Sequence, residues 1–87
     1  MHKITIMSKP GCRLCDEAAE VVRKIVRVPA IIETVDITKD QDLLEKYKDV
    51  IPVILVDGVE RFRHSVDPDQ LASLFMDEPG ESLLGIS

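Results

Sequence analysis

The feature that most constrains this chain is Cys12-Arg13-Leu14-Cys15, which stands where a strand pattern changes into a helix pattern. An apolar run over residues 4–7 predicts a short buried strand, and Lys9-Pro10-Gly11 breaks it. Apolar residues then recur with a 3.6-residue rhythm over residues 14–26, which predicts a helix that Pro29 ends. Because residues three apart on a helix share a face, the two sulfurs can close a small disulfide ring. The pattern predicts a dithiol redox centre at a strand-to-helix turn.

The rest of the chain predicts three further strands and two further helices. The helix between the first two strands makes a unit in which those strands should be parallel. Asp57-Gly58 is a hairpin signal between the third strand, whose continuous apolar run suits a central position, and a charged fourth strand at an edge. The later elements are a strand at 31–37, a helix at 38–48, strands at 53–56 and 59–66, and a helix from Asp67 to Met76. This β-α-β-α-β-β-α order predicts an α/β protein with a four-stranded mixed sheet and helices on both faces.

Composition and charge narrow the class of protein. A chain of 87 residues makes one domain, which we expect over residues 1–76, followed by a tail over residues 77–87. Its net charge of −5 disfavours nucleic acid as a partner, and its apolar runs are too short for a membrane helix. We expect no secretory signal. The two cysteines, three residues apart, would constrain little unfolded chain, so we expect chemistry in a reducing compartment, the cytoplasm, rather than a structural staple.

Beyond these patterns, the chain resembles the thioredoxin superfamily, and most of all the small bacterial glutaredoxin-like proteins. The resemblance covers about residues 3–76 and rests on the stretch from Ser8 to Ala18, on Val35-Asp36-Ile37, on Ile51-Pro52-Val53 and on Leu55-Val56-Asp57-Gly58. It implies a thioredoxin-like (glutaredoxin-like) fold with about three helices around the sheet. It also implies that Cys12 is the exposed nucleophile, that Cys15 is the resolving thiol, and that Pro52 is a cis-proline facing them. Backbone beside that proline, at Ile51, would pair with an extended thiol substrate.

The chain departs from the best-known members of this superfamily at three places. Classical glutaredoxins have proline and an aromatic residue between the cysteines, where this chain has Arg13 and Leu14. Thioredoxins have tryptophan before the first cysteine, where this chain has Gly11. Glutaredoxins grip glutathione with a Gly-Gly pair and an acidic cluster, where this chain has His64-Ser65-Val66-Asp67. The resemblance therefore implies thiol–disulfide exchange without a cofactor, but it does not by itself imply glutathione as co-substrate.

The residues around the cysteines suit such chemistry. Cys12 should lie at the start of a helix, where free N–H groups favour a thiolate, and Lys9 and Arg13 add positive charge. Asp16 and Glu17 oppose this effect. We expect Lys9, Arg13, Ile51 and Pro52 to contact the substrate. The partners would be protein or low-molecular-weight disulfides and a thiol reductant, such as glutathione or a thioredoxin-type system, and the protein would act as a monomer.

Other interpretations of the same residues remain open. The cysteines could serve an iron–sulfur cluster carrier through Cys12, or persist in a non-catalytic thioredoxin-fold adaptor. A closed zinc site needs four ligands, and the chain offers two cysteines beside His2 and His64, which we interpret as surface histidines. We therefore predict no resident metal. Without the cysteines, we would interpret Pro52 as an ordinary trans proline at the start of a strand.

Overall fold

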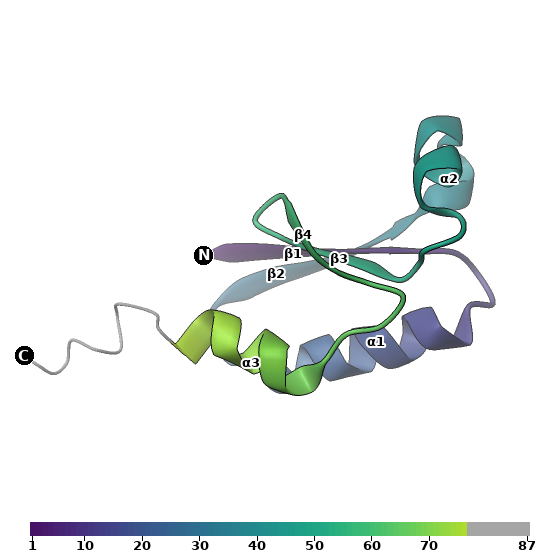
Figure 1. The fold of residues 1–87 in the computed structure, drawn as a ribbon. Coiled ribbons are helices and arrows are strands. Elements are labelled where there is room, and N and C mark those ends of the chain that lie inside the picture. Colours follow the sequence, from purple (N-terminus) through teal and green to yellow (C-terminus); the bar gives the residue numbers. More distant parts are fainter. Residues whose placement is uncertain (77–87) are drawn as a thin grey trace, which may run out of the picture.

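A computed structural model of the chain describes residues 1–76 and shows a single mixed sheet (Figure 1). The strands lie in the order β2-β1-β3-β4, with β1 parallel to β2 and antiparallel to β3, and β3 antiparallel to β4. The predicted order of elements, the parallel first pair and the edge position of the fourth strand are therefore confirmed. In chain order the elements are β1 (His2–Ser8), α1 (Arg13–Ile25), β2 (Ala30–Asp36), a 3₁₀ turn (Ile37–Lys39), α2 (Gln41–Tyr47), β3 (Val53–Val56), β4 (Val59–Arg63) and α3 (Pro68–Met76).

Helices cover both faces of the sheet, as predicted. In Figure 1, α1 and α3 lie together below the sheet, and α2 lies above it at the end where β1 leads into α1. Alternation along the strands separates two cores. Ile4 and Ile6 of β1 face α1 and α3, whereas Met7 contributes to a cluster on the side of α2 that includes Tyr47. The apolar core is thus divided between the two faces of the sheet.

Side-chain caps set where the two later helices begin. Asp40 Oδ1 accepts the N–H groups of Asp42 and Leu43 at 2.9 and 3.2 Å, so α2 begins at Gln41. Asp67 Oδ1 does the same for Asp69 and Gln70 at 2.9 and 3.3 Å, with Pro68 at the first helical position. Asp67 confirms the predicted start of the last helix. The second helix begins at Gln41 rather than at residue 38, because residues 37–39 form the separate 3₁₀ turn.

The structure corrects the ends of two predicted strands. The second strand ends at Asp36 rather than Ile37, because Ile37 begins the 3₁₀ turn and is fully buried. The fourth strand ends at Arg63 rather than Val66, because His64 adopts a left-handed φ of 75° that ends the extended backbone. The N–H of His64 instead donates to the carbonyls of Val50 and Pro52, at 2.9 and 2.8 Å.

The Asp57-Gly58 hairpin forms as predicted. Both residues have positive φ, 52° and 85°, which is the backbone that this two-residue turn requires. Asp57 is also tied to β1, since its Oδ1 accepts the Lys3 N–H at 2.8 Å and its Oδ2 lies 2.6 Å from His2 Nδ1. None of the described helices is long and apolar enough to cross a membrane. The predicted tail over residues 77–87 lies outside the described residues.

Candidate active site

The two cysteines meet across the first turn of α1. The structure joins Cys12 and Cys15 in a disulfide, with their Cα atoms 5.2 Å apart. Gly11, with φ of 79°, turns the chain out of β1, and Cys12 then takes the N-cap position of the helix. The Cys12 sulfur accepts the N–H of Cys15 at 3.2 Å. An N-terminal N–H group directed at this sulfur would stabilise negative charge on it once the disulfide opens.

The two sulfur-bearing side chains differ in exposure. Cys12 is half-buried, whereas only 3% of Cys15 is exposed. Cys15 packs in the cluster on the side of α2, with Met7, Tyr47 and Val53. Incoming substrate can therefore reach Cys12 more readily than Cys15, which fits the unequal roles that the resemblance implies.

Ile51 and Pro52 lie next to the disulfide in the fold. Their peptide bond is cis, Pro52 is fully buried, and Ile51 belongs to the same cluster as Cys15, against which Cys12 also packs. The Pro52 carbonyl accepts the N–H of His64, which fixes the proline between α2 and the end of β4. Within residues 1–76, no hydrogen bond is formed by the Ile51 N–H or carbonyl. These two groups are free to pair with an extended chain.

Arg13 and Lys9 flank Cys12, and the charge of Arg13 is shared with a nearby carboxylate. Both are exposed, and the Lys9 carbonyl accepts the Cys12 N–H at 3.3 Å. Arg13 Nε lies 3.6 Å from Glu17 Oε2, one helical turn further on. This pairing offsets part of the positive charge that Arg13 was expected to bring to Cys12.

Leu14 and His64 are the main site residues that the sequence patterns misplaced. The 3.6-residue rhythm over residues 14–26 predicts that Leu14 lies on the buried face of the first helix, but this side chain is 54% exposed. His64 was assigned to an edge strand, but it lines a small hollow of about 110 Å³ together with Leu14 and Glu17. The signal for His64 was its place in the segment that carries glycines in glutaredoxins. The left-handed φ of 75° that ends the strand at His64 is not indicated by the charged, strand-like pattern of residues 59–66.

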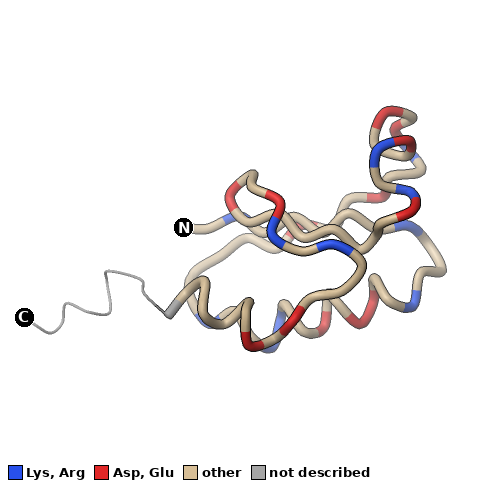
Figure 2. Tube along the Cα trace, in the orientation of Figure 1, with Lys and Arg blue, Asp and Glu red and all other residues tan. Residues whose placement is uncertain are grey.

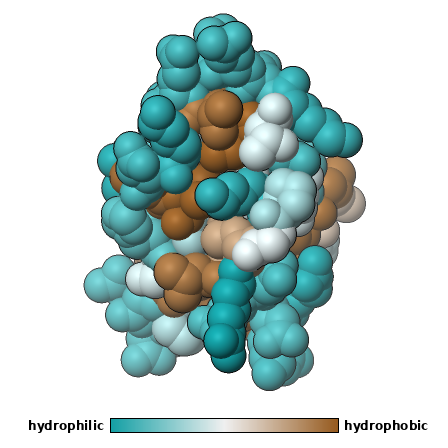
Figure 3. Space-filling model, turned by 90° about the vertical axis from the view of Figure 1, so that its right-hand side faces the viewer, coloured by the Kyte–Doolittle hydropathy of each residue, from teal (hydrophilic) through white to brown (hydrophobic). Residues whose placement is uncertain are grey.

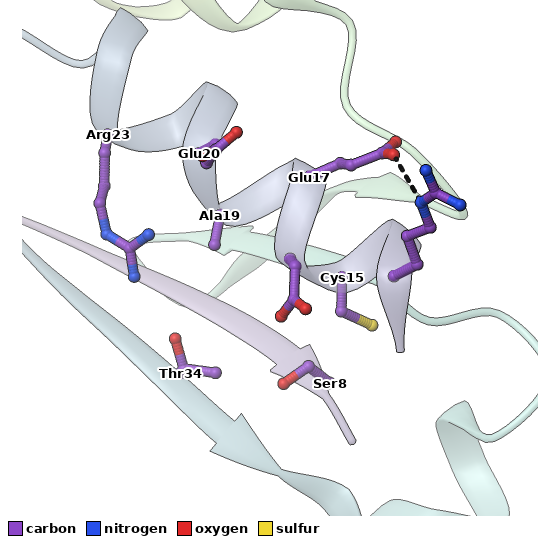
Figure 4. Close-up of a pocket in the computed structure, with 9 residues that line it drawn as sticks. Ser8, Cys15, Glu17, Ala19, Glu20, Arg23 and Thr34 are labelled. Carbon is purple, nitrogen blue, oxygen red and sulfur yellow. Dashed lines mark ion pairs between the residues drawn. The ribbon is translucent and has the colours of Figure 1, made fainter. Parts of the chain in front are cut away.

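A larger hollow of about 480 Å³ lies between α1 and the ends of β1 and β2 (Figure 4). In Figure 4, Ser8 and Thr34 rise from the strands, and Cys15 lies opposite Ser8 at one end of the hollow. Its lining residues are Ser8, Arg13, Cys15, Asp16, Glu17, Ala19, Glu20, Arg23 and Thr34. Ser8 carries the buried polar side chain of the described core, at 8% exposure, and the sequence patterns indicate no role for it.

The end of the molecule that carries the disulfide presents an apolar centre. Figure 3 views the side of the protein where β1 leads into α1, and apolar side chains are exposed there among hydrophilic ones. Charged residues of both signs lie along α1 and α2 (Figure 2), and in α1 the last turn is basic. In residues 1–76, no three His, Cys, Asp or Glu side chains are grouped so that they could hold a metal ion.

Comparisons with known proteins agree with this geometry. Residues 3–75 match the family described as Glutaredoxin-like domain (DUF836). A curated relative, the "Glutaredoxin-like protein YDR286C homolog" of Dictyostelium discoideum, is 33% identical over 75 residues, which are 78% of this chain and 69% of that protein.

Solved structures show the same fold. A structural-genomics protein from X. campestris aligns with a TM-score of 0.70 and 25% identity, over 87% of this chain and 99% of that one. A mutant thioredoxin from Halobacterium salinarum aligns with a TM-score of 0.62 and 20% identity, over 87% of this chain and 73% of that one. The fold is thus thioredoxin-like, and by its sequence match and its paired cysteines the chain belongs to the glutaredoxin-like family of the thioredoxin superfamily.

Proposed function

We propose that this protein is a small dithiol–disulfide oxidoreductase that works through Cys12 and Cys15. The observation that carries the proposal is the pairing of these cysteines across the first turn of α1, with Cys12 half-buried and Cys15 buried behind it. A nucleophile needs access to substrate, whereas a resolving thiol needs only to reach its neighbour. The backbone of Ile51, which packs in the cluster of Cys15, would be the substrate-pairing element that the family resemblance implies.

The proposed cycle has two thiol–disulfide exchanges. The Cys12 thiolate attacks a substrate disulfide, releases one thiol and holds the other half of the substrate in a mixed disulfide. Cys15 then attacks the Cys12 sulfur, the substrate sulfur leaves as the second thiol, and the Cys12–Cys15 disulfide forms. The Cys15 N–H directed at the Cys12 sulfur stabilises Cys12 as a thiolate, both as attacker and as leaving group.

The surroundings of Cys12 favour an extended polypeptide or a small disulfide as substrate. The unpaired N–H and carbonyl of Ile51 offer backbone hydrogen bonds, and exposed Leu14 offers an apolar contact. Lys9 and Arg13 would contact polar groups of the substrate. We further propose a thiol reductant, either glutathione or a thioredoxin-type system, for the oxidised pair. We propose a monomer that acts in the cytoplasm without a resident cofactor.

Trapping the mixed disulfide tests this proposal. The Cys15→Ser protein, incubated with a cell extract and quenched by alkylation, should retain thiol-releasable adducts on Cys12. The Cys12→Ser protein should retain none, and the double variant is the background control. Wild-type protein should also show a reversible intramolecular disulfide and reduce a model disulfide with dithiothreitol present. If Cys15→Ser forms no adduct although its Cys12 reacts with alkylating agents, the two-cysteine cycle is wrong.

A further inference from the structure

The second step of the proposed cycle raises the question of where a proton goes. Cys15 enters that step as a thiol and must lose its proton as its sulfur attacks Cys12. With 3% exposure and apolar neighbours such as Met7 and Val53, Cys15 lies in surroundings that disfavour a thiolate. Apolar side chains cover it on the side of α2. A path of polar groups or water on another side of Cys15, along which this proton could leave, would therefore speed this step.

The hollow beside α1 supplies such a route. Cys15 lines it and Cys12 does not, so it approaches the buried cysteine from a side away from the substrate position. Its volume of about 480 Å³ is ample for several water molecules, each of which occupies about 30 Å³. The hydroxyls of Ser8 and Thr34 can each donate and accept hydrogen bonds along its floor.

Three carboxylates line this hollow, and they are not equivalent. Glu17 is paired with Arg13, and in Figure 4 it extends toward that partner, away from the strands. Glu20 also points away from the strands in Figure 4 and lies five residues beyond Cys15, which is about 7.5 Å along the helix axis. Asp16 is adjacent to Cys15 in the chain and has no ion pair within residues 1–76. It is the carboxylate best placed to exchange a proton with Cys15 through one or two waters.

We propose that Asp16 accepts the proton that Cys15 loses in the resolving step, by way of water in this hollow. The Cys15 S–H bond breaks, its proton passes to the Asp16 carboxylate, and its electron pair forms the bond to the Cys12 sulfur. The bond between Cys12 and the substrate sulfur breaks, and that sulfur leaves with the electron pair and takes a proton from solvent. The substrate is reduced by two electrons, and the cysteine pair is oxidised to the disulfide.

The same group serves the return reaction. When a reductant thiol loses its proton to solvent and attacks Cys12 of the disulfide, Cys15 leaves with the electron pair and takes a proton from water in the hollow by way of Asp16. Asp16 thus acts through Cys15 and does not touch the substrate. The other titratable or charged groups around Cys15 are Arg13, Glu17, Glu20 and Arg23 at the hollow and Tyr47 on the side of α2.

A two-phase reaction tests this proposal, which rests on the proposed function. Reduced full-length protein is mixed in stopped flow with dithiobis(nitrobenzoate), an aromatic disulfide whose thiol product is coloured. Attack by Cys12 releases the first coloured thiol at a rate that depends on reagent concentration. Attack by Cys15 releases the second coloured thiol at a rate that is independent of reagent concentration. Asp16→Asn should slow the second phase roughly a hundredfold at neutral pH, because general-base catalysis contributes about a hundredfold or more.

The controls separate proton transfer from a general electrostatic effect. Glu20→Gln removes a carboxylate from the same hollow and should leave the second phase unchanged, whereas Asp16→Glu should restore much of its rate. The deficit of Asp16→Asn should shrink as pH rises, because hydroxide then deprotonates Cys15 directly. A second phase at the wild-type rate and pH profile in Asp16→Asn, or equal slowing by Glu20→Gln, would overturn the assignment. Absence of the first phase from the wild-type protein would instead overturn the proposed function itself.

Discussion

The two faces of the sheet are built from the same strands but serve different ends. On the face covered by α1 and α3, fully buried Ile4, Ile54 and Leu71 belong to a core of apolar side chains that lies away from the disulfide. On the face covered by α2, the core includes Cys15 and Ile51 beside Met7 and Tyr47. The first face can be optimised for packing alone. The second must pack and also hold a reactive sulfur next to its partner.

The difference follows from where the first helix begins. Most of α1 lies against the first core, through Ala18, Ala19 and Val22. Its first turn extends to the end of the sheet, where Cys15 reaches the cluster on the side of α2. A strand-to-helix turn at the sheet edge therefore places one cysteine in a core and leaves the other at the surface. Substitutions in the two cores should have different consequences for the redox pair.

The largest effect is expected from a cavity in the first core. Leu71→Ala removes a fully buried side chain on α3 and should lower the free energy of unfolding by about 2–5 kcal/mol. Because Leu71 lies outside the cluster that holds Cys15, the loss should be the same in the dithiol and disulfide forms. Urea titrations of both forms measure it, and Leu14→Ala, at a 54% exposed position, serves as the matched control.

A smaller change in the second core should behave differently. Ile37→Val removes one methyl group from a fully buried side chain in the cluster of Cys15 and should cost about 1 kcal/mol. We expect this cost to differ between the dithiol and disulfide forms, since the cluster packs against the sulfur that changes state. The reduction potential then shifts, by about 30 mV for each 1.4 kcal/mol of difference. Equal costs in both forms, with an unchanged potential, would mean that the two cores do not differ in the way argued above.

The sequence was sufficient for most of the fold because its signals are local. Turn residues, helix caps and apolar runs each specify a short segment, and Asp57-Gly58, Asp67-Pro68 and residues 53–56 all adopt the predicted structures. The crossover predicts the parallel first pair, and the apolar run and the hairpin predict a central third strand beside an edge strand. The antiparallel pairing of β1 with β3 comes from the structure alone. The family resemblance supplied the cysteine roles and the cis bond at Ile51-Pro52, of which the structure shows the cis bond.

What the sequence could not supply depends on contacts between distant segments. Leu14 has the helical spacing of a core residue, yet α1 begins beyond the cover of α3, so this side chain stays exposed. His64 left the predicted strand because its N–H bonds to two carbonyls around Pro52. The hollow that joins Ser8, Thr34 and Asp16 arises only when α1 is laid across two strands. Periodicity cannot reveal such features.

The smallest predicted effect lies at the end of the sheet away from the disulfide, at Asp57. Hydrogen bonds from the Lys3 N–H and from His2 lower the pKa of Asp57 below its ordinary value of 3.8. A carboxyl whose folded pKa is depressed stabilises the protein above its unfolded pKa and loses that contribution as pH falls through the folded value. The contribution of Asp57 should therefore be complete above about pH 5, decline as pH falls past 3.8, and disappear only below the lowered pKa of the folded state.

Asp57→Asn tests this contribution because asparagine tolerates the left-handed φ of 52° and preserves the turn. The variant should be less stable than wild type at neutral pH, and the difference should narrow in acid as wild-type Asp57 becomes protonated. Thermal unfolding of both proteins across pH 3–7 measures this stability difference. Other carboxyl groups also titrate in this range, and their effect is common to both proteins. Since Asp57 joins the hairpin to β1 far from Cys12, both phases of thiol release should keep their wild-type rates. A constant stability difference across this pH range would show that the hydrogen bonds of Asp57 do not contribute through its charge.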